Sequence, residues 1–197
     1  MATLAFEVEI PLNRNTSQRP GSESHLLIQT LCSVRQSPLL QLTQRIADSG
    51  CNLADARVST VGDDVSVVLL AQGSWDALAK LETGLGKLAR DPALHLVHYR
   101  TGPRSMQTHL LPYVVEVIAA DRNALLVEVI DFFSRRGISI EQLSSMRYQA
   151  IQTGADMFQA QITIGIPADT HIAALRDDFL ELCDSLNLDA IMDPVKF

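Results

Sequence analysis

The sequence predicts an α+β protein made of two similar units, each an antiparallel sheet with two helices on one face. Three observations lead to this prediction. The chain has 197 residues and is 47% hydrophobic, enough to bury one or two ordinary cores. The pattern of residues 38–60 returns at residues 125–147 with its apolar positions in phase, so that Gly50 falls on Gly137. Helix and strand signals also follow the same order in both halves.

The first half opens with a strand at residues 26–32, followed by a helix. Ser37 is expected to cap this helix, Pro38 suits its first position, and Gly50 ends it. The apolar stripe of the helix consists of Leu39, Leu42 and Ile46.

A hairpin and a second helix complete the first half. Strands at residues 56–60 and 65–71 flank a turn that contains glycine and aspartates. Ser74 is expected to cap the second helix, and residues 94–99 form the last strand. The apolar face of this helix is expected to hold Trp75, Leu78, Leu81, Leu85 and Leu88.

The second half repeats this order. A strand at residues 110–119 leads to a helix at residues 124–136, which Gly137 ends. The residues expected to point inward from this helix are Leu126, Val129, Ile130 and Phe133. Strands at residues 141–148 and 157–166 follow.

A last helix and strand close the second half. Asp169 is expected to cap the helix, and the strand covers residues 188–192. The apolar stripe of this helix consists of Ile172, Leu175, Phe179, Leu182 and Leu186.

Each unit therefore reads β-α-β-β-α-β, the ferredoxin-like arrangement of two helices on one face of a four-stranded antiparallel sheet. The other face needs a partner. Apolar strand residues are expected on both faces of the sheets, so we expect the units to pack on each other or on a second chain. These residues include Val65, Val67, Leu69, Val115 and Val117.

Two further features lie outside the repeated pattern. Residues 4–10 alternate between apolar and polar or small side chains and predict a strand added to an edge, and residues 13–24 read as a polar linker. The three cysteines are widely spaced within apolar patterns, which predicts packed free thiols rather than disulfides or a metal cage. They are Cys32, Cys51 and Cys183.

Composition excludes several classes of protein. The net charge of −7 argues against direct contact with nucleic acid, because such binding depends on Lys and Arg neutralising phosphates. Aromatic residues make up only 5%, too few for a sheet that stacks RNA bases. No apolar stretch reaches the roughly 20 residues that span a bilayer. Glu7 and Glu9 stand where a secretory signal would be positive, so a cytoplasmic location without membrane contact is expected.

One segment resembles a known family. Residues 50–75 contain Cys51-Asn52-Leu53-Ala54-Asp55-Ala56-Arg57, Gly62-Asp63-Asp64 and Leu69-Leu70-Ala71-Gln72-Gly73-Ser74-Trp75. They are similar to the first half of the glycine cleavage system transcriptional repressors, a family of tandem ACT domains. The resemblance covers residues 25 to about 193 and implies ACT domains at residues 25–100 and 109–197. Residues 101–108, with Gly102 and Pro103, read as the linker between them, and residues 1–24 as an extension. The resemblance also implies a regulator that does not bind DNA but restrains a transcription activator in response to glycine.

The resemblance also indicates where a small amino acid would bind. ACT domains generally use the turn after the first strand, often Asp-Arg-Pro-Gly, and a polar residue before the second strand. A helix N-terminus at that turn offers free N–H groups and partial positive charge to a carboxylate. The residues at the matching positions are Arg35, Gln36 and Ser37 with Asn52 in the first unit, and Asp121, Arg122, Asn123 and Ala124 with Ser139 in the second.

Both turns depart from the family pattern. The first unit lacks the acid and the glycine, and Pro38 removes one N–H group. The second keeps Asp121-Arg122 but has Ala124 in place of glycine, which restricts the approach of a ligand to the backbone. An ordinary reading remains beside the binding one, since Asn52 can satisfy a turn amide and Arg35 and Arg122 can be solvated.

No motif of an enzyme is found, so no catalytic residue, cofactor or metal is assigned. His95 and His98 lie three apart on an expected strand and point to opposite faces. One enzymatic alternative shares the topology, an acylphosphatase-like hydrolase in which Arg35 and Asn52 would bind phosphate and water. Its turn lacks the glycines of a phosphate cradle. We expect a non-enzymatic regulator that binds a protein partner, a transcription activator, and that forms a homo-oligomer.

Overall fold

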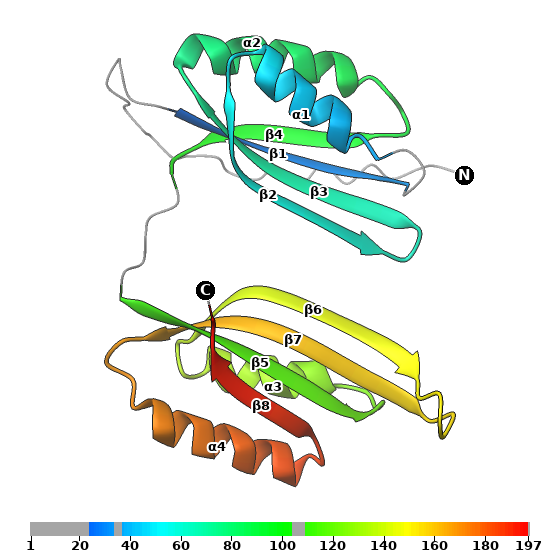
Figure 1. Cartoon of the computed structure of the whole chain (residues 1–197), viewed down its shortest axis with the longest axis vertical. Helices are drawn as coiled ribbons and strands as arrows, with labels where there is room; N and C mark the ends of the chain where they lie inside the picture. The colour runs from blue at the N-terminus through cyan, green and yellow to red at the C-terminus, as the bar shows by residue number, and fades with distance from the viewer. Residues whose placement is uncertain (1–23, 34–36, 104–108, 197) are drawn as a thin grey trace, which may run out of the picture. The chain divides into compact units, whose positions relative to one another are not determined.

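The computed structural model describes residues 24–33, 37–103 and 109–196 (Figure 1). The chain divides into two compact units, Met1–Arg104 and Ser105–Phe197. The predicted strand at residues 4–10 lies outside the described residues, as do Arg35, Gln36 and much of the linker. No helix in the described part of the chain is both long and apolar enough to span a membrane.

The first unit is an antiparallel sheet with its strands in the order β2-β3-β1-β4. Helices α1 and α2 lie on the same face of this sheet (Figure 1). The elements in chain order are β1 Ser24–Ser33, α1 Leu39–Asp48, β2 Asn52–Val61, β3 Asp64–Gly73, α2 Trp75–Leu88 and β4 His95–Thr101.

The second unit repeats this topology with the strand order β6-β7-β5-β8, and α3 and α4 share one face of its sheet (Figure 1). The elements are β5 Leu110–Ala120, α3 Leu125–Ser134, β6 Ser139–Gln149, β7 Asp156–Pro167, α4 Ile172–Ser185 and β8 Asp189–Pro194. The predicted fold class, two ferredoxin-like βαββαβ units, is confirmed.

Glycines end the first helix of each unit as predicted. Gly50 and Gly137 have φ values of +79° and +67°, in the left-handed region that glycine enters without steric cost. The hairpin between β2 and β3 likewise turns at Gly62, with φ +62°. Gly50 and Gly137 therefore show that the repeated sequence pattern adopts a repeated backbone conformation.

Two of the three predicted helix caps are wrong. Ser74 Oγ accepts from the N–H of Ala77 at 3.2 Å, as expected. The N-cap of α1 is Pro38, which has no side-chain acceptor, so Ser37 lies outside the helix. The N-cap of α4 is His171, because its Nδ1 accepts from Ala174 N at 3.2 Å and the helix begins beyond Asp169.

The prediction that one set of strand residues spreads over both faces is also wrong. Val65, Val67 and Leu69 occupy alternate positions of β3 and are all buried beneath the helices, as are Val115 and Val117 of β5. Alternate residues of a strand share a face, so these odd-numbered residues all point toward the helices of their own unit.

The uncovered face carries a different set of side chains. In the first unit it includes Leu31, Val97 and Tyr99, which are exposed. In the second unit it is partly polar, since Gln161 Nε2 donates to Glu116 Oε1 at 2.9 Å across β7 and β5. The uncovered faces are therefore mixed surfaces rather than purely apolar ones.

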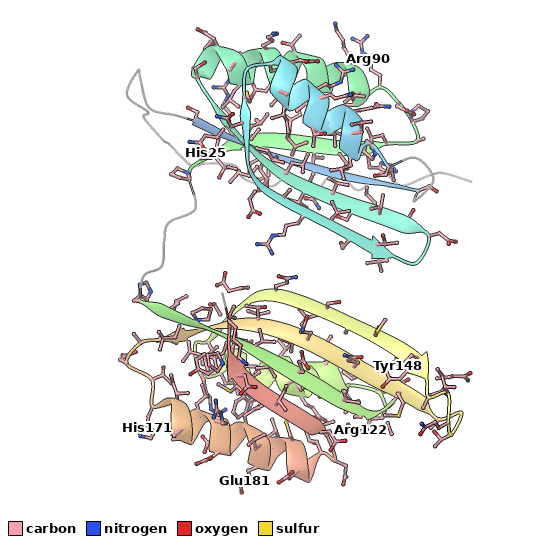
Figure 2. All side chains as sticks on the ribbon, in the orientation of Figure 1. His25, Arg90, Arg122, Tyr148, His171 and Glu181 are labelled. Atoms are coloured by element: carbon pink, nitrogen blue, oxygen red, sulfur yellow. The ribbon has the colours of Figure 1, made fainter. Side chains whose placement is uncertain are left out.

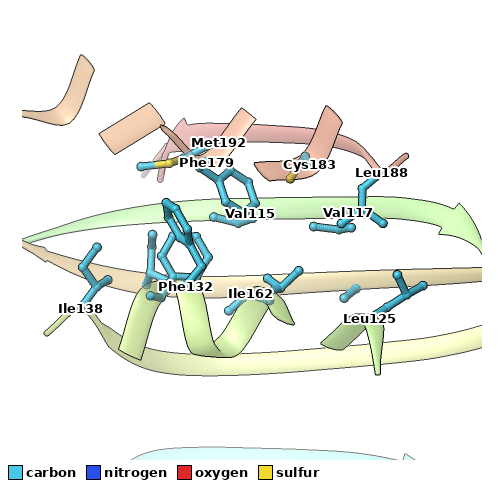
Figure 3. Packing of buried hydrophobic residues seen from close by; sticks show 14 of the residues in the cluster. Val115, Val117, Leu125, Phe132, Ile138, Ile162, Phe179, Cys183, Leu188 and Met192 are labelled. Atoms are coloured by element: carbon cyan, nitrogen blue, oxygen red, sulfur yellow. The ribbon is translucent and has the colours of Figure 1, made fainter. Parts of the chain in front are cut away.

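The core of the second unit is built around three phenylalanines. Phe133 and Phe179 are fully buried, and their ring centroids lie 5.0 Å apart. Phe132 lies 5.1 Å from Phe133 and 5.3 Å from Phe179 (Figure 3). Helix α3 turns Leu125 and Phe132 into this core, where the sequence pattern favoured Leu126 and Ile130, which are only partly buried.

One expected core residue of the first unit lies at the surface. Trp75 is 65% exposed, and the Arg100 guanidinium lies 5.1 Å from its ring centroid. Arg100 also donates to both carboxylate oxygens of Glu82, at 2.9 and 3.0 Å. These hydrogen bonds lower the pKa of Glu82 and outweigh the opposing effect of its burial. As the first residue of α2, Trp75 shares the apolar stripe but lies beyond the packed centre of the helix.

All three cysteines are buried thiols outside any disulfide, as predicted. Burial raises the pKa of Cys32 and of Cys51, and it raises that of Cys183 to about 11. A thiol with a raised pKa is seldom in the nucleophilic thiolate form. The three cysteines are therefore packing residues.

Candidate functional site

The predicted turn of the second unit connects β5 to α3. Asp121 N donates to Asp156 O at 2.9 Å, which fixes the turn against the start of β7. Arg122 Nη2 donates to Glu128 Oε2 at 3.1 Å. Arg147 Nε lies 3.1 Å from Asp121 Oδ1, an ion pair whose angle is not that of a hydrogen bond. Each arginine at this turn thus faces one carboxylate.

Ala124 has an unusual backbone conformation for its residue type. It is the N-cap of α3 with φ +69° and ψ 3°, in the left-handed region where a Cβ atom is strained. Its side chain offers no cap, so the first N–H groups of α3 have no side-chain acceptor from this position. Such strain is often kept where a backbone conformation serves a site.

A hollow of about 370 Å³ opens beside this turn. Figure 2 labels Arg122 at the turn and Tyr148 on the neighbouring strand β6. The hollow is lined by Arg122, Ala124, Leu125, Leu126, Val127, Ser145, Met146, Arg147 and Phe158. Its walls therefore combine the start of a helix, two arginines and an apolar base.

The chemistry of this hollow suits the carboxylate of a small molecule. The start of α3 presents free N–H groups and the positive end of the helix dipole, which favour a carboxylate. Arg122 and Arg147 line the hollow and add positive charge. Their carboxylate partners, Glu128 and Asp121, are not among the lining residues.

Ser139, the polar residue predicted before the second strand of this unit, does not line the hollow. Ser139 pairs through Gly165 with Pro112, whereas the turn follows Ala120 at the other end of β5. At about 3.4 Å per residue, the strand between Pro112 and Ala120 is roughly 27 Å long. The Ser139 hydroxyl instead donates to Glu141 Oε1 at 2.8 Å. No single small ligand can touch both parts of the second unit.

The same separation holds in the first unit. Asn52 is the exposed first residue of β2 and pairs through Gln72 with His25 near the start of β1, whereas Ser37 follows the end of β1. A hollow of about 310 Å³ adjoins Ser37 and Pro38. Ligand contact by each of the nine predicted residues stays a prediction.

Sequence reasoning missed the strand side of the hollow. Ser145, Met146, Arg147 and Phe158 come from β6 and β7, and the register that pairs Arg147 with Phe158 brings them to the turn. A sequence signal existed in the hairpin, since pairing outward from residues 150–155 would have placed residues 147 and 158 opposite each other. Among the described residues, no group of three or more His, Cys, Asp or Glu side chains is placed to hold a metal ion.

The strained alanine gives a direct prediction. Ala124→Gly should raise the free energy of unfolding by about 1 kcal/mol, because glycine adopts φ +69° without the Cβ clash. Hydrogen exchange of backbone amides in β5 and β7 measures the change in the second unit. Ala173→Gly at an exposed position of α4 is the control and should lower stability by about 1 kcal/mol. If glycine destabilises both positions alike, Ala124 is not in the left-handed region.

The fold and the turn together define a tandem of two ACT-like units. Residues 24–99 match the family model of the ACT domain, from the start of β1 to Tyr99 in β4. Over 177 residues, the chain is 27% identical to the glycine cleavage system transcriptional repressors of Escherichia coli strain K12 and Shigella flexneri. These matches cover 90% of the chain and 93% of each relative. The resemblance to this repressor family therefore extends through both units.

Solved structures show the same fold. A crystal structure assigned as a glycine cleavage system transcriptional repressor has a TM-score of 0.65 at 24% identity, over 89% of this chain and 99% of that one. A protein of unknown function from Galdieria sulphuraria has a TM-score of 0.71 at 14% identity, over 89% and 100%. At these identities the two structures support the fold alone.

Proposed function

We propose that the chain is a non-enzymatic regulator that binds a transcription activator of glycine cleavage genes and restrains it. The observation that carries the proposal is the similarity to named repressors across 90% of the chain, through both units. The net charge of −7 is consistent with a regulator that acts on a protein rather than on DNA.

A small amino acid, glycine or a close relative, is proposed to tune this contact. The hollow at Arg122 and Ala124 supports the idea because it combines a helix N-terminus, two arginines and apolar side chains around about 370 Å³. A ligand can shift a conformational equilibrium only through its difference in affinity for the two states. The amino acid would favour the conformation of the α3 turn that the activator binds.

Calorimetry can test both parts of the proposal on the full chain. We expect the purified activator from the same organism to bind, and a small amino acid to change that affinity. Arg122→Ala should abolish the amino-acid effect, whereas Arg90→Ala, an exposed arginine of the first unit, should leave it unchanged. A flat titration with all twenty amino acids would reject sensing, and absence of activator binding would reject the regulatory proposal.

The acylphosphatase-like alternative uses Arg35 and Asn52. Arg35 lies outside the described residues, and Asn52 is the first residue of β2, paired with Gln72. Such an enzyme would hydrolyse an acyl phosphate such as acetyl phosphate, and Arg35→Ala would abolish the activity. Turnover by the wild-type chain that depends on Arg35 would replace the regulatory proposal with this one.

A further inference from the structure

The helix layers of the two units differ in charge. Residues 125–136 and 172–185, which span α3 and α4 with the two arginines after α3, contain six carboxylates and three arginines. Helices α1 and α2 contain three acidic and three basic residues. The helix layer of the second unit is therefore acidic, whereas that of the first is balanced.

A groove of about 630 Å³ runs between α3 and α4 on this acidic layer. Its apolar base is formed by Phe132, Leu182 and Leu186, which also pack in the core of the unit. Its walls are charged, and Glu181 lies on the outward side of α4 (Figure 2). The groove thus offers an apolar strip bordered by carboxylates.

The charges in the groove are mostly paired already. Arg135 donates to Asp131 at 2.8 Å, and Arg136 donates to Asp178 at 3.3 Å across the two helices. Within the described part of the chain, Glu181 has no ion pair. An added cation would find this carboxylate unmatched, whereas an added anion would be repelled.

The groove also shows how a guanidinium can sit on its base. The Arg136 guanidinium lies 3.8 Å from the centroid of the Phe132 ring while it pairs with Asp178. An aromatic face and a carboxylate together make a favourable place for a cation. A second basic side chain that enters beside Glu181 would meet the same apolar base and another carboxylate.

We propose that this groove docks a short basic segment of the protein partner, one with lysine or arginine beside an apolar residue. The proposal rests on the proposed function, because it assigns the surface that binds the partner. Charge complementarity identifies the occupant, since the layer is acidic and the two arginines that line the groove are already paired. The apolar residue of the segment would lie on Leu182 and Leu186, and its basic side chain would pair with Glu181.

A synthetic amphipathic peptide of leucine and arginine tests this assignment at about 0.15 M salt, where distant charges are screened. Fluorescence anisotropy measures its affinity for the full chain, and amide chemical shifts locate it. Glu181→Lys should weaken binding about fivefold or more, because it places a like charge in the groove. Asp177→Lys is the matched control, since it makes the same charge change on an exposed site of α4 that does not line the groove.

Weakening by Glu181→Lys alone, with shifts concentrated on α3 and α4, is the expected result. Equal weakening by both variants would mean attraction to net charge and would overturn the assignment, as would shifts elsewhere or no binding. The activator itself separates this proposal from the function. If the wild-type chain and both variants bind the activator equally, only the assignment of the groove as the docking surface is wrong. If none of them binds the activator, the proposed regulatory function is wrong.

Discussion

Phe179→Ala is expected to lower the free energy of unfolding of the second unit by about 3–5 kcal/mol. The ring is fully buried and contacts Phe132 and Phe133, with ring centroids 5.3 and 5.0 Å away. Removing it forfeits the burial of the ring and leaves a cavity that close-packed neighbours fill only in part. A loss of this size is a large fraction of the stability of a small domain.

Hydrogen exchange of backbone amides in β5 and β7 measures this loss in the second unit, which a single denaturation curve of a two-unit chain would not isolate. Tyr148→Ala, which removes an exposed ring from β6 of the same unit, is the control and should cost less than about 1 kcal/mol. Similar losses for the two variants would contradict the three-phenylalanine core.

Gly165→Ala is expected to lower the free energy of unfolding by about 1–3 kcal/mol, as overpacking does in a filled core. Gly165 is a buried residue of β7, and a Cβ there would lie 2.6 Å from Ser139 Oγ and 2.9 Å from Leu110 Cδ1. Both distances are too short for real contacts, so the side chains of Ser139 and Leu110 would have to move.

Hydrogen exchange of the backbone amides of each unit, measured for two further variants, isolates this cause. Gly86→Ala on α2 meets nothing within 4 Å and should stabilise by about 0.5–1 kcal/mol, because glycine disfavours a helix interior. Ser139→Ala together with Gly165→Ala should recover part of the loss, since it removes the closer contact. No recovery in the double variant would mean that the crowding at Ser139 is not the cause.

Local signals fixed the repeated topology well. Gly50 and Gly137 required a left-handed backbone and therefore ended their helices in both the pattern and the structure. The ends of strands were harder to predict from the sequence. Strand β2 begins at Asn52 rather than at residue 56, because β3 pairs with the added residues. The cap of α4 was missed because the helix begins beyond Asp169 and is capped by His171, which is not among the residue types that usually cap helices.

The candidate site was predictable only on its helix side. The turn at Arg122 followed from its position after the first strand, whereas Arg147 reaches the hollow through the pairing of β6 with β7, which had to be extended from the hairpin turn. The left-handed Ala124 could not be foreseen, because alanine disfavours that conformation. The groove at Glu181 depends on how two helices of different sequence position pack, which periodicity alone does not determine.

Expression from a glycine cleavage promoter, measured with and without the activator in the presence of this chain, tests the proposed indirect regulation most directly. The account predicts that the chain lowers expression only when the activator is present and leaves promoter DNA unbound in an electrophoretic shift assay. Repression in cells that lack the activator, or a shift of the DNA by the chain alone, would contradict it.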